Sequence, residues 1–518
     1  MKLLLALLIA WPAMAQPARP ALEVRPFEVR LAAAVFAQAF AFVAIRALEP
    51  VTVQQLALWG LNGLSALDPA LSVRTDPNML RLVQSGRDIY QRGIPAPASD
   101  PDAGAGAERS SEVWGPAVAE MLSAAWDASD AVRRAGTPGV IAAAFEEIVT
   151  HLDPYSRYVA PGAADLDRDR RIGDAGAGLK LARQGRSVVV VSVNQAGPGA
   201  EAGIVAGDRL LAVDDQPVEM EDLTTITAMI AGVEGTDVSL TIRHRDGSIR
   251  TVEAERTVIP AETVFAERRG DVLLIRITGF SADTDQRLRQ ELSRWLGRGV
   301  RLRGLVIDLR GNRGGLLRQA VAATELLQGA GVIATTTGRN PAADHDFKGT
   351  GTDQTDGLRL AVLVDGRSAS AAEIMAAALA DNGRAVVIGS GTLGKGLVQT
   401  VANLPDGSEL FVTWSRVLAP LGWPIQGLGV MPQICTSLGA ESLAQQLSSL
   451  ARGQSRLAQS LTRQRAARAP LLPGTILRLR ESCPAADGPE ARNDPDFTTA
   501  RTVLGDFRLF EAALLPAR

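Results

Sequence analysis

The chain has 518 residues, of which 46% are hydrophobic and 21% are charged, and its formal net charge is −3. This length is enough for roughly two to four domains with apolar cores. Because the two signs of charge are interspersed and form no long basic stripe, the composition argues against a nucleic-acid partner and favours an ordinary soluble protein.

The first 15 residues have the pattern of a secretory signal peptide. Lys2 precedes an apolar stretch over residues 3–11, and Ala13 and Ala15 form a small-residue cleavage pattern. We therefore expect cleavage after Ala15 and export to the periplasm or another extracytoplasmic compartment. A second apolar run, residues 31–45, is shorter than the roughly 20 residues that span a bilayer, so we expect a buried core helix there.

Residues 16–165 are predicted to form a helical N-terminal region. Apolar residues recur at spacings of three and four from about residue 16 to residue 93, and again over residues 113–151. Between these stretches, residues 94–112 are rich in Pro, Ala, Gly and Ser, which indicates a linker or long loop.

The next two segments differ in their patterns. Residues 166–258 contain short β-branched runs, such as 186–193 and 237–244, and one helical stretch, 220–232. This pattern predicts a small β-rich module with one helix. Residues 259–434 alternate between strands and helices, which predicts a layered α/β domain with mostly parallel neighbouring strands.

The last segment, residues 435–518, is predicted to be a helical, polar extension, and both cysteines of the chain lie in it. In an exported protein, Cys435 and Cys483 favour one disulfide, worth about 4 kcal/mol in the chain-entropy model; two free thiols are the alternative. Neither cysteine has a metal-ligand spacing, and the three histidines are scattered. We therefore expect no metal and no cofactor.

The stretch RSASAAEIM, residues 367–375, has two interpretations. Ser370 and Glu373 form a capping-box pattern ahead of an alanine-rich run, so the serine is either a helix cap alone or a nucleophile at a helix start. A nucleophilic serine needs a neighbouring base, because a hydroxyl is a poor nucleophile at neutral pH.

Lys395 is the candidate base. Only four of the 54 cationic residues are Lys, and one of them lies in GSGTLGKG, residues 389–396. A desolvated lysine can be deprotonated, whereas an arginine cannot. A helix from Ser370 to about Asp381, followed by a returning strand over residues 384–389, brings Lys395 back to the level of Ser370. To act as a base, Lys395 needs a pKa that falls from about 10.4 to roughly 7 or 8.

The GSGTLGKG stretch also nearly matches a phosphate-binding loop, which would indicate a nucleotide hydrolase. Gly396 stands where such loops have a Ser or Thr ligand of Mg²⁺, and the residues that follow have a strand pattern instead of a helical one. These two differences argue against nucleotide hydrolysis, so we expect no binding of Mg-ATP.

A Gly-rich turn, DLRGNRGG over residues 308–315, is a second candidate part of the site. It is either a plain connection from a strand to a helix or a source of backbone amides for an oxyanion. The amides at the start of the Ser370 helix are aimed at the same kind of charge.

Several blocks of the chain resemble the carboxyl-terminal processing peptidases, also called tail-specific proteases. Over residues 145–434 these blocks stand in the order of that family: LDPYSRYVAP, PGAEAGIVAGDRLLAVDDQPV, GLVIDLRGNRGGLL, GRSASAAEIMAAALADNGRAVVIG, GTLGKGLVQ, LPDGSEL and PIQGLGVMP. The resemblance implies a serine endopeptidase with a crotonase-like layered α/β core, an inserted β-rich PDZ domain and a helical N-terminal region. A catalytically silent peptide-binding scaffold on the same fold is the alternative.

The resemblance also assigns roles to single residues. It makes Ser370 the nucleophile, Lys395 the general base and Gln399 the residue that orients this base. The backbone amides of Gly314 and Ala371 correspond to the oxyanion hole. In one extended run Gln399 would lie about 13 Å from Lys395, so its role rests on the family and requires a bend after Lys395, at Gly396 in the sequence.

Two further parts of the chain correspond to family positions. The family's Asn-Pro pair before the paired glycines is Asn312-Arg313 in this chain, which affects the shape of the oxyanion turn. Asp381 matches a family position too, but helix geometry places it at the far end of the helix from Ser370, so we expect a structural role.

The PDZ resemblance places a carboxylate-binding loop at Gly176, Ala177, Gly178 and Leu179, where backbone amides would capture the C-terminus of a peptide while the peptide adds as a strand. A simple glycine turn is the alternative. The expected partners are protein or peptide C-terminal tails as substrates. An adaptor lipoprotein and a homo-oligomer stay open.

Overall fold

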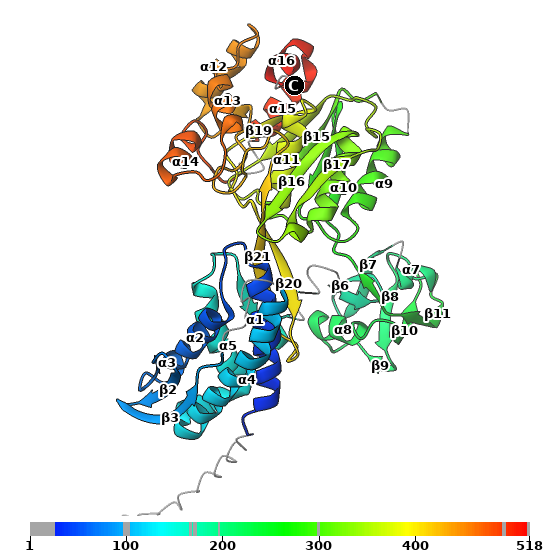
Figure 1. Cartoon of the computed structure of the whole chain (residues 1–518). Coiled ribbons are helices and arrows are strands. Elements are labelled where there is room, and N and C mark those ends of the chain that lie inside the picture. Colours follow the sequence, from blue (N-terminus) through cyan, green and yellow to red (C-terminus); the bar gives the residue numbers. More distant parts are fainter. Residues whose placement is uncertain are drawn as a thin grey trace, which may run out of the picture.

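The computed structural model describes residues 26–96, 104–164, 168, 174–194, 197–297, 301–488 and 494–514, so the predicted signal peptide lies outside the described residues. Figure 1 shows a helical N-terminal unit, a β-rich unit, and an α/β unit that carries the C-terminal helices. The mixed α/β architecture with a β-rich module and a helical N-terminal region is therefore confirmed.

The N-terminal unit is built mainly from helices, and α1 packs along α4 at its centre. The helices are α1 (Val29–Arg46), α2 (Val53–Asn62), α3 (Leu64–Leu67), α4 (Gly104–Ala128) and α5 (Asp130–Thr150). Among the described residues, α1 is the one helix long and apolar enough to cross a membrane, with a mean hydropathy of 1.6. Its buried residues recur at helical spacing and join the core of this unit, as expected for a core helix: Ala32, Val35, Phe36, Ala39, Phe40, Val43 and Ala44.

Residues 71–93 correct the helical prediction for this region. They form an antiparallel three-stranded sheet of β1 (Leu71–Thr75), β2 (Met79–Gln84) and β3 (Arg87–Gly93). Leu80 and Leu82 alternate into the core, and Ser85 and Gly86 close the turn with positive φ. Alternating burial and a two-residue turn of this kind are signals of a hairpin, and they outweigh the apolar spacing.

The predicted linker at residues 94–112 is also partly wrong, because α4 begins at Gly104. Ala107, Ser110, Ser111 and Trp114 are buried along this helix at spacings of three and four. Because the buried face consists largely of small and polar residues, the segment has the composition of a linker, although its buried residues recur at helical spacing.

The β-rich unit has a sheet with the strand order β11-β10-β8-β7-β6, and β9 pairs with β8. Its strands are β5 (Asp174–Gly176), β6 (Leu179–Gln184), β7 (Ser187–Val193), β8 (Arg209–Val213), β9 (Gln216–Pro217), β10 (Asp237–Arg243), β11 (Ile249–Glu255) and β12 (Thr257–Ile259). β5 pairs with β12 where the unit is entered and left. Helix α8 (Leu223–Ile230) lies in the predicted helical stretch, and one-turn α7 (Pro198–Glu201) was not expected.

The α/β unit is centred on a sheet with the order β13-β14-β15-β18-β19-β22, in which β14, β15, β18, β19 and β22 are parallel. The strands are β13 (Val264–Arg269), β14 (Val272–Ile277), β15 (Gly304–Asp308), β18 (Leu360–Val364), β19 (Ala385–Gly389) and β22 (Ile434–Cys435). Every residue of β15, β18 and β19 is buried, because helices cover both faces of the sheet.

One face of this sheet packs against α9 (Thr284–Leu296), α10 (Leu317–Gln328) and α11 (Ala371–Asp381). The other face packs against α12 (Ala440–Leu450), α15 (Pro495–Gly505) and α16 (Phe507–Ala513), all from the C-terminal extension. The extension also includes α13 (Ala458–Ala466) and α14 (Pro473–Arg480), and a disulfide joins Cys435 to Cys483. The extension is helical, as predicted, and it completes the layers of the α/β unit.

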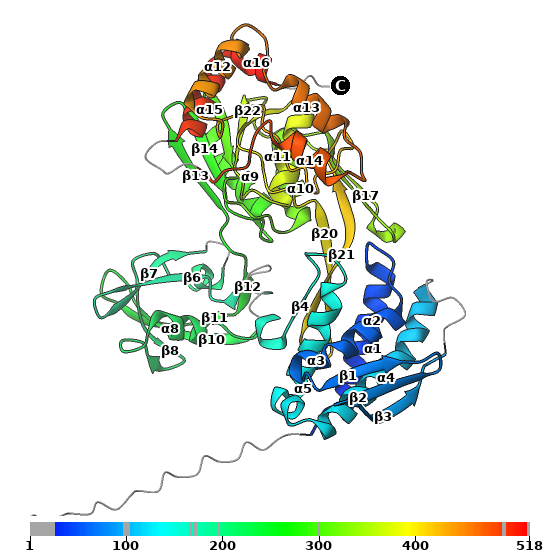
Figure 2. The same ribbon diagram turned by 90° about the vertical axis from the view of Figure 1, so that its left-hand side faces the viewer.

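A second sheet has the order β17-β16-β21-β20, and β4 pairs with β21. Its strands are β4 (Arg157–Val159), β16 (Gly331–Gly338), β17 (His345–Gly349), β20 (Leu397–Asn403) and β21 (Glu409–Leu418), and the 3₁₀ helix η1 (Pro341–Ala343) lies between β16 and β17. Figure 1 and Figure 2 both show β20 and β21 running from the α/β unit to the N-terminal helices. Ala402, Leu410 and Val412 at their far end belong to the N-terminal core. The N-terminal unit is thereby attached to the strands that follow Lys395.

Candidate active site

Ser370 lies in the turn between β18 and α11, directly before the first residue of the helix. Its backbone has φ 57° and ψ −117°, a conformation that residues other than glycine rarely adopt. The turn is fixed on both sides, since Ser368 is buried and donates to the Leu309 carbonyl, and the Ala369 amide donates to the Asn312 carbonyl at 2.9 Å. A serine held in a strained conformation by its surroundings is typical of a functional position.

Lys395 arrives at the same edge of the central sheet. β19 pairs in parallel with β18, with Val364 opposite Gly389, so both strands end at the level of the Ser370 turn. Residues 390–396, here called the Lys395 loop, follow β19 and lead into β20. As the sequence predicted, α11 runs away from Ser370 and β19 returns the chain to the same edge of the sheet.

The carboxylate of Glu373 joins these two segments. Its Oε2 atom accepts the backbone N–H of Ser370 and the backbone N–H of Lys395, both at 2.8 Å. Its Oε1 atom accepts the Gly394 amide at 2.7 Å and the Thr392 hydroxyl. The side chain is completely buried, and burial raises the pKa of Glu373 while these hydrogen bonds oppose the rise. We call this arrangement the Glu373 clamp.

A cavity of about 430 Å³ brings the predicted residues together. Ser370, Ala371, Lys395, Gln399 and Gly314 all line it. Its other walls include residues of the second sheet, among them Arg157 of β4, and the turn around Phe280.

The surroundings of Lys395 favour its neutral form. Burial lowers the pKa of Lys395, the positive charge of Arg157 lowers it further, and the carboxylates of Asp153 and Glu373 oppose the shift. The Nζ atom of Lys395 lies 5.1 Å from the centre of the Tyr155 ring. The sequence showed the family-like block LDPYSRY but not that its residues Asp153, Tyr155 and Arg157 lie near Lys395.

Gln399 shares the cavity with Lys395 but has other hydrogen-bond partners. Its side-chain amide donates to the Thr413 hydroxyl at 3.2 Å, and that hydroxyl donates to Asp153 at 2.7 Å. Between the two residues, β20 begins at Leu397, directly after Gly396, and its pairing with β21 has a bulge between Val398 and Gln399.

The glycine turn lies against Ser370. Gly314 has φ 99°, and a Cβ there would lie 2.9 Å from the Cβ of Ser370, so glycine permits this close approach. The Gly314 amide donates to the Asn312 side chain at 2.8 Å, an internal acceptor that the sequence did not predict. Ala371 is the first residue of α11, so its N–H has no partner within the helix. Gly315, which was not among the predicted residues, lines the same cavity.

Asp381 is placed at the opposite end of α11. Its carboxylate pairs with Arg465 of α13 at 2.7 Å and accepts the indole N–H of Trp423 at 2.8 Å. These contacts give it the structural role expected from helix geometry.

The predicted peptide-binding residues line a separate groove of about 440 Å³ in the β-rich unit. The four residues run from Gly176, the last residue of β5, to Leu179, the first residue of β6. Thr227 and Ile230 of α8 and the following Ala231 line the same groove. Ala261 lines both this groove and the cavity of Ser370, so the two are neighbours. Among the described residues, no group of three or more His, Cys, Asp or Glu is placed to hold a metal ion.

Comparison with known proteins identifies the family. Family models for Peptidase family S41 and for a PDZ domain match residues 271–436 and 189–244. A carboxy-terminal-processing protease of Bartonella bacilliformis is 33% identical over 296 residues, which cover 56% of this chain and 68% of that protein. A carboxyl-terminal-processing protease of Picosynechococcus sp. is 34% identical over 289 residues, which cover 54% of this chain and 69% of that protein.

Among solved structures, the photosystem II D1 C-terminal processing protease matches with 28% identity and a TM-score of 0.35, over 61% of this chain and 87% of that one. The sequence relatives carry the assignment, because each is at least 30% identical and more than two thirds of each is matched. The chain therefore belongs to peptidase family S41, as a serine peptidase of the carboxyl-terminal processing kind with a PDZ domain.

Proposed function

We propose that the chain is an exported serine endopeptidase that binds the C-terminal tail of a protein in its PDZ groove and cleaves a peptide bond at Ser370. Lys395 acts as the general base of a Ser/Lys dyad on a crotonase-like core. The observation that carries this proposal is the Glu373 clamp, because one carboxylate oxygen holds the backbones of the nucleophile and of the base.

The chemistry needs one lysine to act as base and then as acid in each of two steps, acylation and deacylation. Neutral Lys395 takes the proton of the Ser370 hydroxyl as its oxygen attacks the carbonyl carbon of the scissile bond, and a tetrahedral oxyanion forms. The intermediate collapses to an acyl-enzyme when Lys395 gives this proton to the leaving amine. A water molecule, deprotonated by the same lysine, then attacks the ester, and Lys395 returns this proton to the Ser370 oxygen as the acid product leaves.

Backbone amides stabilise the oxyanion in this proposal. The Ala371 amide belongs to the start of α11, where the helix dipole also favours negative charge. The turn at Gly314 supplies the second donor, which requires the Gly314 amide to exchange its Asn312 acceptor for the substrate. Gln399 lines the same cavity and orients the Lys395 amine when substrate is bound. In the free enzyme, the side chain of Gln399 is held by Thr413, which in turn donates to Asp153.

The PDZ groove supplies recognition. A C-terminal tail adds as a strand beside β6, with its carboxylate at the amides of Gly176, Ala177, Gly178 and Leu179. Because Ala261 borders both cavities, a bound tail would enter the site from close by.

The Cys435–Cys483 disulfide and the N-terminal pattern support an extracytoplasmic location. An adaptor lipoprotein and self-association stay open.

Intact-mass spectrometry tests the proposal directly. An unfolded protein with an apolar C-terminus is incubated with the mature enzyme, with Ser370→Ala and with Lys395→Ala. Lys348→Ala is the matched control, because Lys348 is exposed and pairs with Asp346. We expect fragments from the wild type and the control alone. Binding of the tail without cleavage by any of the four proteins would favour the silent scaffold.

A further inference from the structure

The C-terminal extension reaches the Lys395 loop through Arg480, the last residue of α14. Its Nη2 donates to the carbonyl of Thr392 at 2.7 Å, and its Nη1 donates to the carbonyl of Leu428 at 2.8 Å. One guanidinium therefore joins the Lys395 loop to the segment that lies against it. A Cβ at Gly429 would lie 2.9 Å from the Arg480 Nη1, so glycine at this position leaves room for the contact.

This contact lies next to the Glu373 clamp. Thr392, whose carbonyl binds Arg480, uses its hydroxyl to donate to Glu373 and to accept the Val430 amide at 2.8 Å. Burial lowers the pKa of Arg480, and attraction to the Glu373 carboxylate opposes the shift. Arg480 thus contributes positive charge near a buried carboxylate and a hydrogen bond to the loop that this carboxylate holds.

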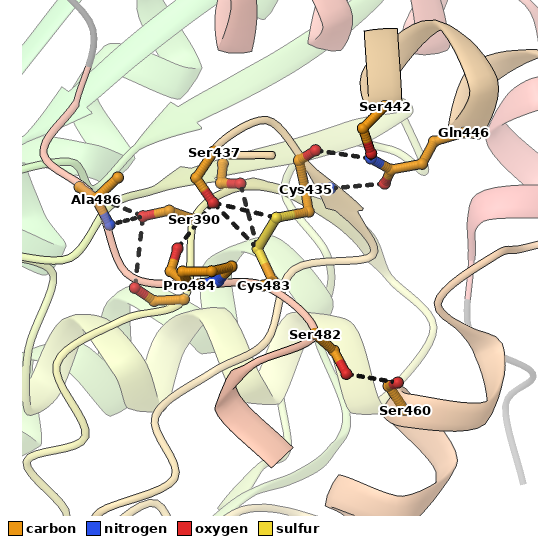
Figure 3. Close-up of a disulfide and its surroundings, with 12 residues drawn as sticks. Ser390, Cys435, Ser437, Ser442, Gln446, Ser460, Ser482, Cys483, Pro484 and Ala486 are labelled. Atoms are coloured by element: carbon orange, nitrogen blue, oxygen red, sulfur yellow. Dashed lines mark hydrogen bonds between the residues drawn. A yellow bond between two sulfur atoms is a disulfide. The ribbon is translucent and has the colours of Figure 1, made fainter. Parts of the chain in front are cut away.

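The disulfide fixes the chain directly after Arg480. Cys483 is bonded to Cys435, which ends β22 at the edge of the central sheet. Figure 3 shows how the following residues are tied down, since the Ser390 hydroxyl donates to the Ala486 carbonyl at 2.9 Å and accepts the Ala486 amide at 3.1 Å. Ser390 is the first residue of the Lys395 loop. The extension therefore holds this loop both at its start and at Thr392.

We propose that Arg480 is a positioning residue for the base Lys395, and that the Cys435–Cys483 disulfide keeps it in place. The proposal rests on the Ser/Lys function proposed above. Arg480 does not itself line the cavity; it acts through the Thr392 carbonyl and through the charge of Glu373.

The loss of Arg480 has two expected consequences. The Lys395 loop is held by fewer bonds, so kcat falls, while KM for a tailed substrate changes little because the tail is held by the PDZ groove. Arg157, Asp153 and Glu373 are the charges that act on Lys395. Without Arg480 the charge of Glu373 is less compensated and raises the pKa of Lys395, so the rise of kcat/KM with pH moves to higher pH.

The experiment uses the mature full chain and an unfolded protein substrate with an apolar C-terminus. We expect Arg480→Met to lower kcat by about tenfold or more, with the alkaline shift described above, and Arg480→Lys to recover part of the loss because it keeps the charge. Arg478→Met is the matched control, because Arg478 lies on the same helix turn, is exposed and donates to Thr475 of its own helix. Ser370→Ala is measured in the same assay.

The outcomes separate the two proposals. If Ser370→Ala is inactive but Arg480→Met keeps the wild-type kcat and pH profile, the Arg480 proposal is overturned and the peptidase proposal stands. If Ser370→Ala cleaves as well as the wild type, or if the wild type does not cleave, both are overturned. If Arg480→Met fails a thermal unfolding check, Arg480→Lys and the phosphine-reduced wild type decide instead. An unchanged kcat in both would contradict the proposal.

Discussion

Ser370 and Lys395 donate their backbone N–H groups to the same oxygen atom, Oε2 of Glu373, each at 2.8 Å. The relative position of the two residues therefore depends on one buried side chain and not only on the packing of their separate loops. The capping pattern seen in the sequence is therefore also a link between segments, since Glu373 bonds both the start of the helix and the Lys395 loop.

Replacement of Glu373 by Gln tests this clamp. Gln offers one acceptor oxygen in place of two and turns an NH2 group toward amide donors, so we expect a stability loss of about 2–3 kcal/mol. We also expect kcat to fall by about 100-fold, because small displacements of reacting groups are costly. Both are measured, by denaturant unfolding and by steady-state cleavage. Glu325→Gln is the control, because Glu325 also accepts two backbone amides, from Thr350 and Gly351, at a loop outside the cavity. Wild-type turnover in Glu373→Gln would show that cleavage does not depend on the Glu373 clamp.

The central sheet could be predicted from the sequence because its signals are local. β15, β18 and β19 are short, continuous apolar runs, and each is followed by a turn and a helix or a loop, the pattern of buried parallel strands. The positions of Ser370 and Lys395 followed from adding a helix length to a strand length.

The parts that were missed depend on contacts between distant segments. The Tyr155–Arg157 segment acts on Lys395 because β4 pairs with β21, and no local pattern in either strand specifies the other. Similarly, Arg480 has no signal of its own, since its bonds go to backbone carbonyls of two remote loops. In residues 71–93, apolar residues fit both a helical and an alternating spacing, and the turn at Gly86 decided between them.

The pH dependence of cleavage provides a test of the Lys395 environment. The base form of Lys395 is the neutral amine, so kcat/KM rises with pH, and its midpoint lies below 10.5 because burial lowers the pKa and Arg157 lowers it further. Arg157→Gln removes the second cause. We expect the midpoint of this rise to move to higher pH, while Arg92→Gln, in the ion pair with Glu120 of the N-terminal unit, leaves it in place. A midpoint that is the same in Arg157→Gln and the wild type would contradict this account.

Replacement of Lys395 by Met is expected to abolish cleavage and to stabilise the fold. The folded-state pKa of Lys395 is depressed, so the charged lysine is less favourable in the folded chain than in the unfolded one at every pH below its folded pKa. As pH rises from the folded pKa toward the unfolded pKa of about 10.5, Lys395 loses its proton in the folded chain before it does so in the unfolded chain. The free-energy cost of burying the charged lysine therefore disappears. We expect a Tm increase of about 2 °C or more at pH 7 that shrinks toward pH 10, measured by calorimetry. A Tm below that of the wild type at pH 7 would show that the ammonium stabilises the fold.

The ion pair between Asp381 and Arg465 anchors the extension to the far end of α11. Both side chains are buried, so Asp381→Asn leaves an uncompensated guanidinium and is expected to cost about 3 kcal/mol or more. The double variant Asp381→Leu, Arg465→Met removes both charges, and we expect it to recover a large part of this loss. Denaturant unfolding of Asp381→Leu, of Arg465→Met and of the double variant gives the interaction energy. Additive losses would mean that the two side chains do not depend on each other.

The PDZ groove is tested at Gly178, which has φ 73° and whose added Cβ would lie 3.2 Å from the Cβ of Asn194. Gly178→Ala strains the loop proposed to bind the carboxylate, so we expect KM for a tailed protein to rise by about fivefold or more while kcat is retained. Gly185→Ala is the control, because Gly185 has φ 61° in the β6–β7 turn with open space around it, so it introduces backbone strain of the same kind away from the groove. If the groove binds the terminal carboxylate, amidation of the substrate tail raises KM for the wild type and has little further effect on Gly178→Ala. Equal KM values for free and amidated tails in the wild type would instead show that this groove does not recognise a C-terminus.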